Sequence, residues 1–251
     1  MPANHLPDPI LQYCQKLSCI TYENITKILH FTATGNKTLA QQQENALQQD
    51  LDHWLGGGTC FSLTWHLYQK LQEMGYTSQL LMGHKRHQRN VHCALLLRYD
   101  GLSWFFDPGY LIFDPLPIPL PRPIGPGWNF HPLRPNWVRL EHGNGGLGLW
   151  TGCGNEKPKL RFEFPLSGVS ESEFHHHWVQ SFSAEMMNYP VLNRLDRERG
   201  IQYYYQKGNL LIRSSEGSQM RAIAPENRIA ELQSLFGLST ELLENAQDFL
   251  T

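Results

Sequence analysis

Three residue types that together can perform nucleophilic catalysis occur in order along the chain: Cys60, His92 and Asp107. Cys60 follows Gly56-Gly57-Gly58-Thr59 and opens a predicted helix. The first turn of a helix has unpaired N–H groups and a partial positive charge, and both favour a thiolate over a thiol. A histidine can hold such a thiolate as an ion pair, and an aspartate can orient the histidine. The sequence therefore predicts a Cys-His-Asp site with a cysteine nucleophile.

A predicted β-hairpin brings two of these residues together. The dipeptide Asp100-Gly101 is typical of a two-residue type I′ turn, here between strands expected over Val91–Tyr99 and Leu102–Asp107. In that register His92 and Asp107 are diagonal neighbours on one face of the sheet, with backbones about 7–8 Å apart. The hairpin therefore supports the histidine–aspartate pair, although it does not by itself bring the cysteine to it.

Each of the three residues also has a structural interpretation. A cysteine on an amphipathic helix is more often a small core residue than a nucleophile. His92 beside a carboxylate can be a purely structural hydrogen bond, and Asp107 directly before Pro108 can belong to a turn. The combination of a glycine turn, a cysteine at a helix start and a hairpin that couples the other two favours catalysis.

The composition favours a soluble enzyme. The chain has 251 residues, of which 41% are hydrophobic and 18% charged, and this suits one large domain or two to three small ones sharing a core. A net charge of -2 gives no reason to expect a nucleic acid or an anionic membrane as partner. No apolar run approaches the roughly 18 residues that span a bilayer, and no signal-peptide pattern is visible. Five scattered cysteines indicate a reducing compartment with free thiols, so we expect the cytoplasm.

Residues 1–76 are expected to be helical. Asp8 is expected to cap a first helix with Pro9 at its first position. Further helices are predicted over Thr38–Trp54, which is rich in Gln, Leu and Ala, and over Cys60–Met74, which carries an apolar stripe.

The segment from Thr77 to about Phe164 is predicted to form strands and loops. Nine of the 16 prolines lie in Pro108–Pro135, which leaves no room there for a regular helix. His175-His176-His177 is expected in a strand or loop. Residues 191–251 are predicted to contain a hairpin around Lys207-Gly208-Asn209 and two closing helices.

Other apparent motifs carry less weight. The segment 143–148 satisfies G-x-G-x-x-G, but glycines and a proline interrupt the following turns, so we expect a flexible loop and no dinucleotide site. The histidines and cysteine between His84 and Cys93 lack the paired spacing of a closed zinc site, and no metal is expected. The basic run in the same segment is expected to be a solvated loop, in which Arg86 and Arg89 are the candidates for contacts with coenzyme phosphates.

The sequences around the three residues resemble motifs of the arylamine N-acetyltransferase family. Gly57-Gly58-Thr59-Cys60-Phe61 is similar to the core of the family's Arg-Gly-Gly-x-Cys-x-Glu-type motif. Val91-His92-Cys93-Ala94-Leu95 resembles its histidine before an apolar strand, and Asp107-Pro108-Gly109-Tyr110 resembles its Asp-x-Gly-Phe motif. Ile20–Ile25 and Leu232–Leu238 are similar to the family's Pro-Phe-Glu-Asn-Leu and Phe-Gly-Ile segments, so the resemblance spans most of the chain.

The resemblance implies an α+β fold with a cysteine-protease-like Cys-His-Asp core. An N-terminal helical bundle (1–76) would carry the nucleophile, a central β-barrel (77–190) the histidine and aspartate, and an α/β lid (191–251) would close the structure. The implied reaction moves an acetyl group from acetyl-coenzyme A to Cys60 and then to an arylamine or hydrazine. The implied partners are a small-molecule amine and an acyl donor, and no tightly bound cofactor is expected.

Substrate contacts are expected close to the three catalytic candidates. The residues beside the three catalytic candidates are expected to contact substrate: Phe61, Val91, Gly109 and Tyr110. An aromatic surface that could hold a flat amine is expected from Phe61, Trp65, Phe105, Tyr110 and Phe113.

Several positions depart from the family pattern. Gly56 and Ser62 stand where the family has arginine and glutamate, and Tyr110-Leu111 stands where it has Phe-Gly. These departures leave other functions open. One alternative is an amide synthase that takes its acyl group from a carrier protein. Another is a transglutaminase-like or papain-like cysteine hydrolase, and a third is a binding protein that has lost activity.

Overall fold

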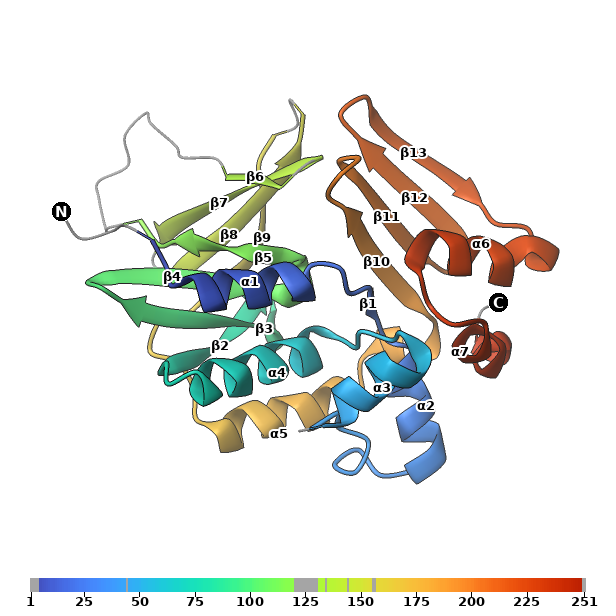
Figure 1. The fold of residues 1–251 in the computed structure, drawn as a ribbon, viewed down its shortest axis with the longest axis horizontal. Coiled ribbons are helices and arrows are strands. Elements are labelled where there is room, and N and C mark those ends of the chain that lie inside the picture. Colours follow the sequence, from blue (N-terminus) through green and yellow to red (C-terminus); the bar gives the residue numbers. More distant parts are fainter. Residues whose placement is uncertain are drawn as a thin grey trace.

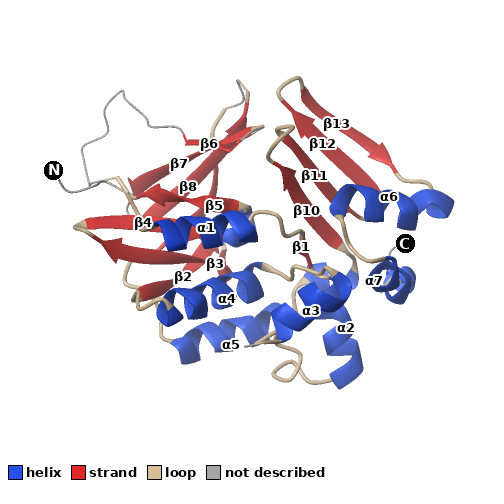
Figure 2. Cartoon of the chain, viewed as in Figure 1, coloured by secondary structure: helices blue, strands red, loops and turns tan. Residues whose placement is uncertain are grey.

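The computed structural model describes residues 5–43, 45–119, 131–133, 135–143, 145–154 and 157–249. It confirms the α+β class: helices from the N-terminal part lie along one side of a curled antiparallel sheet, and a second sheet carries the C-terminal helices (Figure 1). Two of the helices, α4 and α5, lie below the first sheet, and α6 and α7 lie beside the second sheet (Figure 2).

Four helices precede the first sheet. They are α1 (Asp8–Leu17), α2 (Ile25–Thr34), α3 (Ala46–Trp54) and α4 (Cys60–Glu73). The predicted Cys60 helix is confirmed, and nine of its 14 residues are buried. The expected cap of α1 is wrong by one residue, because Pro7 is the N-cap and Asp8 lies within the first turn without a capping hydrogen bond.

The helix predicted over Thr38–Trp54 is also too long. Its first part forms turns, in which Asn36 Oδ1 accepts the N–H groups of Thr38 and Leu39 at 2.9 and 3.2 Å. Two of the glutamines that suggested a helix, Gln41 and Gln42, are buried and donate hydrogen bonds through their side chains. Gln42 Nε2 lies 2.6 Å from an oxygen of Asp50, and this inward direction is incompatible with an exposed helical face.

Among the described residues, the first sheet has eight strands in the order β5-β4-β3-β2-β9-β8-β7-β6. They are β2 (Ser78–Lys85), β3 (Gln88–Tyr99), β4 (Leu102–Asp107), β5 (Ile112–Pro117), β6 (His131–Leu133), β7 (Asn136–Gly143), β8 (Gly146–Cys153) and β9 (Lys159–Phe164). In the described part of the chain β5 and β6 are its two edges, so the expected closed barrel is corrected to an open half-barrel. The chain between these edges is rich in proline, which cannot donate to a strand ladder. Residues 120–130 of that proline-rich stretch lie outside the described residues.

The predicted hairpin between β3 and β4 is confirmed in its register. Tyr99 pairs with Leu102 and Leu95 with Phe106. Asp100 and Gly101 have φ values of 48° and 75°, the two positive angles of a type I′ turn.

Two interpretations in the middle of the chain are corrected. The three histidines lie in helix α5 (Glu171–Ser181). Ser170 Oγ accepts the N–H of Glu173 and caps this helix. Phe174 and Trp178 form its buried face. The G-x-G-x-x-G segment joins β7 and β8, whose residues Gly143 and Gly146 pair across the turn. It is therefore a hairpin connection, and its Asn144 lies outside the described residues.

The second sheet has the order β1-β10-β11-β12-β13. Its strands are β1 (Tyr22–Glu23), β10 (Val191–Asp196), β11 (Ile201–Gln206), β12 (Asn209–Ser214) and β13 (Gly217–Ala222). The predicted hairpin of β11 and β12 and the closing helices α6 (Arg228–Phe236) and α7 (Thr240–Asn245) are confirmed. Because β1 comes from the N-terminal part, the second sheet ties both ends of the chain together. The three-segment domain division stays a prediction.

Short 3-10 helices complete the described chain. They are η1 (Pro108–Tyr110), η2 (Glu185–Asn188), η3 (Pro225–Asn227) and η4 (Gln247–Phe249). One apolar core lies between α1, α4, α5 and the first sheet, a second lies inside the curl of that sheet, and a third joins the second sheet to α6 and α7. None of the described helices has the length and hydropathy that a membrane-spanning helix requires.

Candidate functional site

The glycine turn before α4 fixes the position of Cys60. Gly58 has a φ of +70°, and a Cβ at Gly57 would lie 2.0 Å from the carbonyl oxygen of Thr21, so this backbone has no room for side chains. The buried Ser62 Oγ accepts the Thr59 N–H at 2.8 Å and thereby caps the helix. Cys60 therefore lies in the first turn of α4, and it is 8% exposed.

His92 and Asp107 form a buried pair, as the hairpin predicts. His92 Nε2 lies 2.8 Å from each carboxylate oxygen of Asp107. Oδ1 of Asp107 also accepts the N–H of Tyr110 at 2.9 Å, which fixes the carboxylate at the start of η1. The ring of His92 is thus oriented with its other nitrogen, Nδ1, free for a third group.

The thiol of Cys60 hydrogen-bonds to the His92 ring, and Gly109 lets it approach. A Cβ built on Gly109 would lie 2.3 Å from Cys60 Cβ and 3.0 Å from His92 Cε1. Both side chains therefore converge on the backbone of η1, where only a glycine fits. The structure thus brings together the three residues that the sequence identified as catalytic candidates.

The surroundings of Cys60 favour its thiolate. A hydrogen bond from Cys93, and after it one from His92, lower the pKa of Cys60 well below its ordinary value, in spite of burial. Burial opposes the charge on His92, but Asp107 and Cys60 outweigh it and raise the pKa of His92 to about 10. Burial raises the pKa of Asp107, while the His92 ring and the Tyr110 N–H counteract this. These directions favour a thiolate–imidazolium pair.

Two aromatic residues enclose the imidazole. Phe162 of β9 stacks on His92 with ring centroids 4.2 Å apart, and Tyr110 meets His92 edge-on at 6.3 Å. The sequence analysis missed Phe162, because its contact depends on the pairing of β2 with β9, and no local pattern in the sequence indicates that pairing.

Lys27 is a second residue that the sequence did not identify. It lies on α2, is 3% exposed, and its Nζ donates to Ser181 Oγ at 2.6 Å. No carboxylate within the described ranges forms an ion pair with it. Burial lowers the pKa of Lys27 to about 8, whereas the neighbouring Cys60 and Cys93 raise it. A buried cation near the nucleophile adds to the forces that favour a thiolate.

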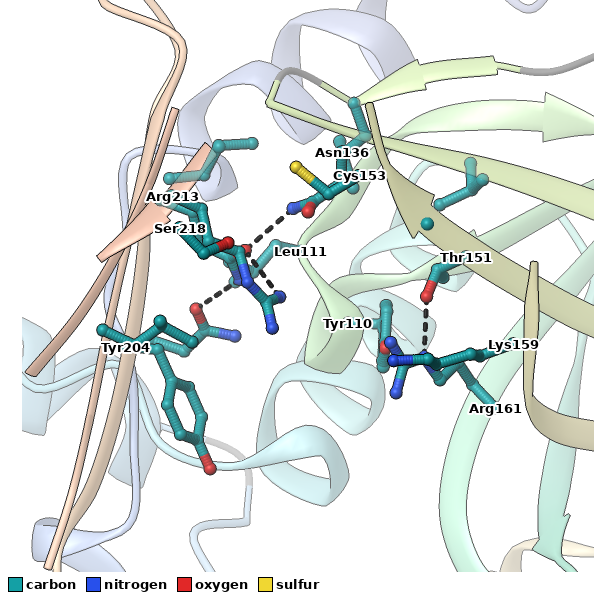
Figure 3. A pocket seen from close by; sticks show the side chains of 17 residues that line it. Tyr110, Leu111, Asn136, Thr151, Cys153, Lys159, Arg161, Tyr204, Arg213 and Ser218 are labelled. Carbon is teal, nitrogen blue, oxygen red and sulfur yellow. Dashed lines mark hydrogen bonds between the residues drawn. The ribbon is translucent and has the colours of Figure 1, made fainter. Parts of the chain in front are cut away.

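A cavity of about 470 Å³ lies between the half-barrel and the second sheet (Figure 3). Lys159 and Arg161 of β9 point into it from one side and Arg213 of β12 from the other (Figure 3). Among its described lining residues none is acidic. Tyr110 also lines it, so the cavity reaches the residue that packs against His92. Three cations without an opposing carboxylate suit an anionic ligand.

The predicted substrate contacts lie in different surroundings. Tyr110 lines the cavity and Gly109 touches Cys60, whereas Val91 is 41% exposed. Phe61 faces away from the cavity, because it stacks on Trp178 of α5 within the core. The expected aromatic surface is corrected in the same way, since four of its members are core residues: Phe61, Trp65, Phe105 and Phe113.

The two candidates for coenzyme contacts lie away from the cavity. Arg86 lies in the turn between β2 and β3 and Arg89 near the start of β3; both are exposed, and neither belongs to the described cavity lining. Arg161 and Arg213 are the arginines that the structure places on its walls, and the sequence offered no signal for them because they come from different sheets. Within the described ranges, no three His, Cys, Asp or Glu side chains lie close enough together to bind a metal ion.

Comparison with known proteins gives a clear result for the fold alone. No protein-family model and no curated protein sequence matches this chain. The structure, however, is similar to solved structures of arylamine N-acetyltransferases. The enzyme of Mycobacterium marinum in complex with CoA has a TM-score of 0.74 at 15% identity, covering 99% of this chain and 97% of that chain.

Two further structures agree with this similarity. Arylamine N-acetyltransferase from Salmonella typhimurium has a TM-score of 0.73 at 17% identity, covering 98% of this chain and 94% of that chain. An arylamine N-acetyltransferase from Bacillus cereus, described as having a unique Cys-His-Glu catalytic triad, has a TM-score of 0.69 at 16% identity, covering 95% and 94%. This chain therefore has the fold of arylamine N-acetyltransferases over nearly its whole length.

Proposed function

We propose that this chain is an acyltransferase in which Cys60 accepts an acyl group from acetyl-coenzyme A or a related thioester and passes it to an amine. The convergence of Cys60 and His92 on Gly109, with His92 hydrogen-bonded to Asp107, carries the proposal. The shared fold with arylamine N-acetyltransferases, one of them solved with CoA, supports it.

In the first half-reaction the Cys60 thiolate attacks the thioester carbonyl. Backbone N–H groups at the start of α4 stabilise the resulting oxyanion. The C–S bond to the donor breaks, and the leaving thiolate takes a proton from the His92 imidazolium. Cys60 then carries the acyl group, and His92 is neutral.

In the second half-reaction the amine attacks the Cys60 thioester. Neutral His92 removes the proton that the amine loses, and the collapse of the tetrahedral intermediate releases the amide and the Cys60 thiolate. Asp107 holds the ring in one orientation and stabilises its charged form in both steps. The starting ion pair is thereby restored.

The cavity between the two sheets is the proposed place of the acyl donor. Lys159, Arg161 and Arg213 would face the phosphate groups of a coenzyme A ester, because guanidinium and ammonium groups bind phosphate through charge-assisted hydrogen bonds. Tyr110 joins this cavity to the His92 ring, so it would lie beside the acyl end.

Intact-mass spectrometry after incubation with acetyl-, propionyl- and longer acyl-coenzyme A tests the proposal. We expect one acyl group per chain, mapped to Cys60 by peptide analysis and absent in Cys60→Ala. A matched variant, Cys19→Ala, should acylate like the wild type because the exposed Cys19 belongs neither to the triad nor to the described cavity lining. Acylation that persists in Cys60→Ala contradicts the proposal, and acylation only by a carrier-protein thioester would identify an amide synthase.

A further inference from the structure

A carboxylate lies buried directly behind the glycine turn. Glu23 of β1 is 0% exposed. Its Oε1 accepts the N–H of Gly58 at 2.8 Å and the hydroxyl of Thr26 at 2.6 Å, and its Oε2 accepts the N–H of Thr26 at 2.9 Å. No lysine or arginine of the described chain forms an ion pair with it. The proposed mechanism does not use this acid, although burying one without a cation is costly.

Glu23 hydrogen-bonds to both backbone polar groups of Gly58. The Glu23 N–H donates to the Gly58 carbonyl at 3.0 Å, while the Glu23 side chain accepts the Gly58 N–H. Gly58 is left-handed, and a Cβ there would lie 2.3 Å from Ser62 Oγ and 2.8 Å from Gln42 Oε1. Gly58 lies two residues before Cys60, so a displacement of the Gly58 backbone also displaces the nucleophile.

A chain of hydrogen bonds continues from Glu23 to the surface. The Thr26 hydroxyl, which donates to Glu23, accepts from Gln42 Nε2 at 3.0 Å. The same Nε2 donates to Asp50 at 2.6 Å, and His30 Nε2 lies 2.9 Å from that Asp50 oxygen. His30 is partly exposed, whereas the other members are buried. All donors point toward the two carboxylates, which is the arrangement that ionised acids require.

The absence of a side chain at position 56 allows this arrangement. A Cβ on Gly56 would lie 2.6 Å from Thr26 Cγ2 and 3.2 Å from Glu23 Oε1. Thr26 and Glu23 therefore pack against the glycine turn and occupy the space that a side chain at position 56 would need. The Glu23 carboxylate accepts the N–H of Gly58 and so stabilises the turn.

We propose that Glu23 is a positioning residue for the nucleophile. Its hydrogen bonds to Gly58 keep Cys60 in the first turn of α4 facing His92. The hydrogen-bonded side chains behind it support this position: Thr26, Gln42, Asp50 and His30. The inference rests on the proposed role of Cys60. It adds a residue that touches neither the substrate nor the reacting atoms.

Two variants test the proposal. Glu23→Gln places an amide where two N–H groups need acceptors, and Thr26→Val cuts the link between Gln42 and Glu23 at nearly constant volume. Glu185→Gln, on an exposed acid, and Thr34→Val, on the exposed end of the same helix, are the matched controls. The rate of Cys60 alkylation by iodoacetamide is measured across pH by peptide mass spectrometry, with the exposed Cys19 as internal reference.

We expect Glu23→Gln to lower the Cys60 rate at neutral pH at least about tenfold, and Thr26→Val to lower it about threefold, because small displacements of a reacting group are costly. The pH midpoint of the reaction should rise in both, while Cys19 and the controls stay unchanged. In turnover assays kcat should fall more than KM changes.

Variants that melt at lower temperature but keep the wild-type Cys60 rate and pH midpoint would show a structural role only and overturn the inference. Thr26→Val decides the question if Glu23→Gln does not fold, because it leaves both backbone donors to Glu23 in place. A wild-type chain in which Cys60 reacts no faster than Cys19 would refute the proposed nucleophile instead, so the two failures are distinguishable.

Discussion

At the level of single residues, the surroundings of Cys60 separate it from the other four cysteines. Cys14 and Cys93 are buried, and burial raises the pKa of each thiol, whereas Cys60 has a lowered pKa because Cys93 and His92 hydrogen-bond to its thiolate. His92 in turn depends on Asp107 for its raised pKa of about 10. The reactivity of one sulfur atom is thus set by a short chain of neighbours.

The first prediction concerns pH. Because the pKa of Cys60 is lowered and that of His92 is raised, the ion pair exists between these two values. We expect the iodoacetamide rate at Cys60 to stay nearly constant as the pH falls from about 8 to about 7, whereas free cysteine, with a pKa near 8.5, slows several-fold. Peptide mass spectrometry measures the rate, and a Cys60 profile parallel to free cysteine would contradict the ion pair.

The second prediction concerns Asp107. Asp107→Asn preserves the shape of the side chain but removes the charge that stabilises the imidazolium, so the pKa of His92 should fall and that of Cys60 should rise. We expect acyl transfer to fall at least about a hundredfold, with little change in the unfolding temperature. The exposed Asp114→Asn is the matched control. Near-normal turnover of Asp107→Asn would remove Asp107 from the mechanism.

At the level of elements, the site depends on the contact between α4 and η1. Gly109 has no side chain, and this lets the backbone of η1 touch Cys60. Leu111, which follows η1, has a φ of +61°, a conformation that favours glycine. Leu111 therefore has a strained backbone at the end of this turn, and the burial of its side chain stabilises that conformation.

The third prediction tests this contact. Gly109→Ala places a methyl group 2.3 Å from Cys60 Cβ, so η1 and α4 must move apart. We expect kcat/KM for acyl transfer to fall at least about a hundredfold, because a displacement of about 1 Å is enough for such a loss. Gly143→Ala, where the new Cβ has only ordinary contacts, should retain full activity. A fully active Gly109→Ala would show that the close contact is not required.

The elements that the sequence predicted correctly are those with local signals. Asp100-Gly101 determines the register of its hairpin, and this register places His92 next to Asp107. The glycine turn and the apolar stripe were likewise sufficient to predict the helix that begins at Cys60. These features depend on residues that are close in the sequence.

The features that were missed depend on distant partners. Gln42 lies outside a helix because its side chain bonds to Thr26 and Asp50. The three histidines are helical because Phe174 and Trp178 bury one face of α5 against Phe61. Such tertiary contacts override local preferences, and no pattern in the sequence reveals them.

At the level of the whole molecule, two sheets built from different parts of the chain enclose the cavity. Asn136 of β7 donates to Gln202 of β11 at 2.8 Å and so links the two sheets across it. Arg161 comes from the first sheet and Arg213 from the second, and the anionic preference of the cavity exists only when both sheets are in place. The proposed donor site therefore depends on the complete fold.

The fourth prediction tests the cavity. Arg161→Gln removes a charge from its wall, and we expect KM for acetyl-coenzyme A to rise about tenfold, since a hydrogen bond to a charged group contributes about 1.5–3 kcal/mol. Acylation by a small acetyl thioester without phosphates should not change. Arg98→Gln, on the exposed surface of β3, is the control. An unchanged KM would place the donor elsewhere.

The central claim is that Cys60 carries an acyl group in order to transfer it, and the lifetime of the acylated protein tests this most directly. Acetylated protein is freed of donor, divided, and followed by intact-mass spectrometry with and without an aromatic amine or hydrazine. We expect the thioester to survive for minutes in buffer and to disappear within seconds when the amine is added, with one equivalent of acetylated amine formed. A thioester that decays equally fast in buffer alone, without formation of amide, would contradict transfer and identify a hydrolase.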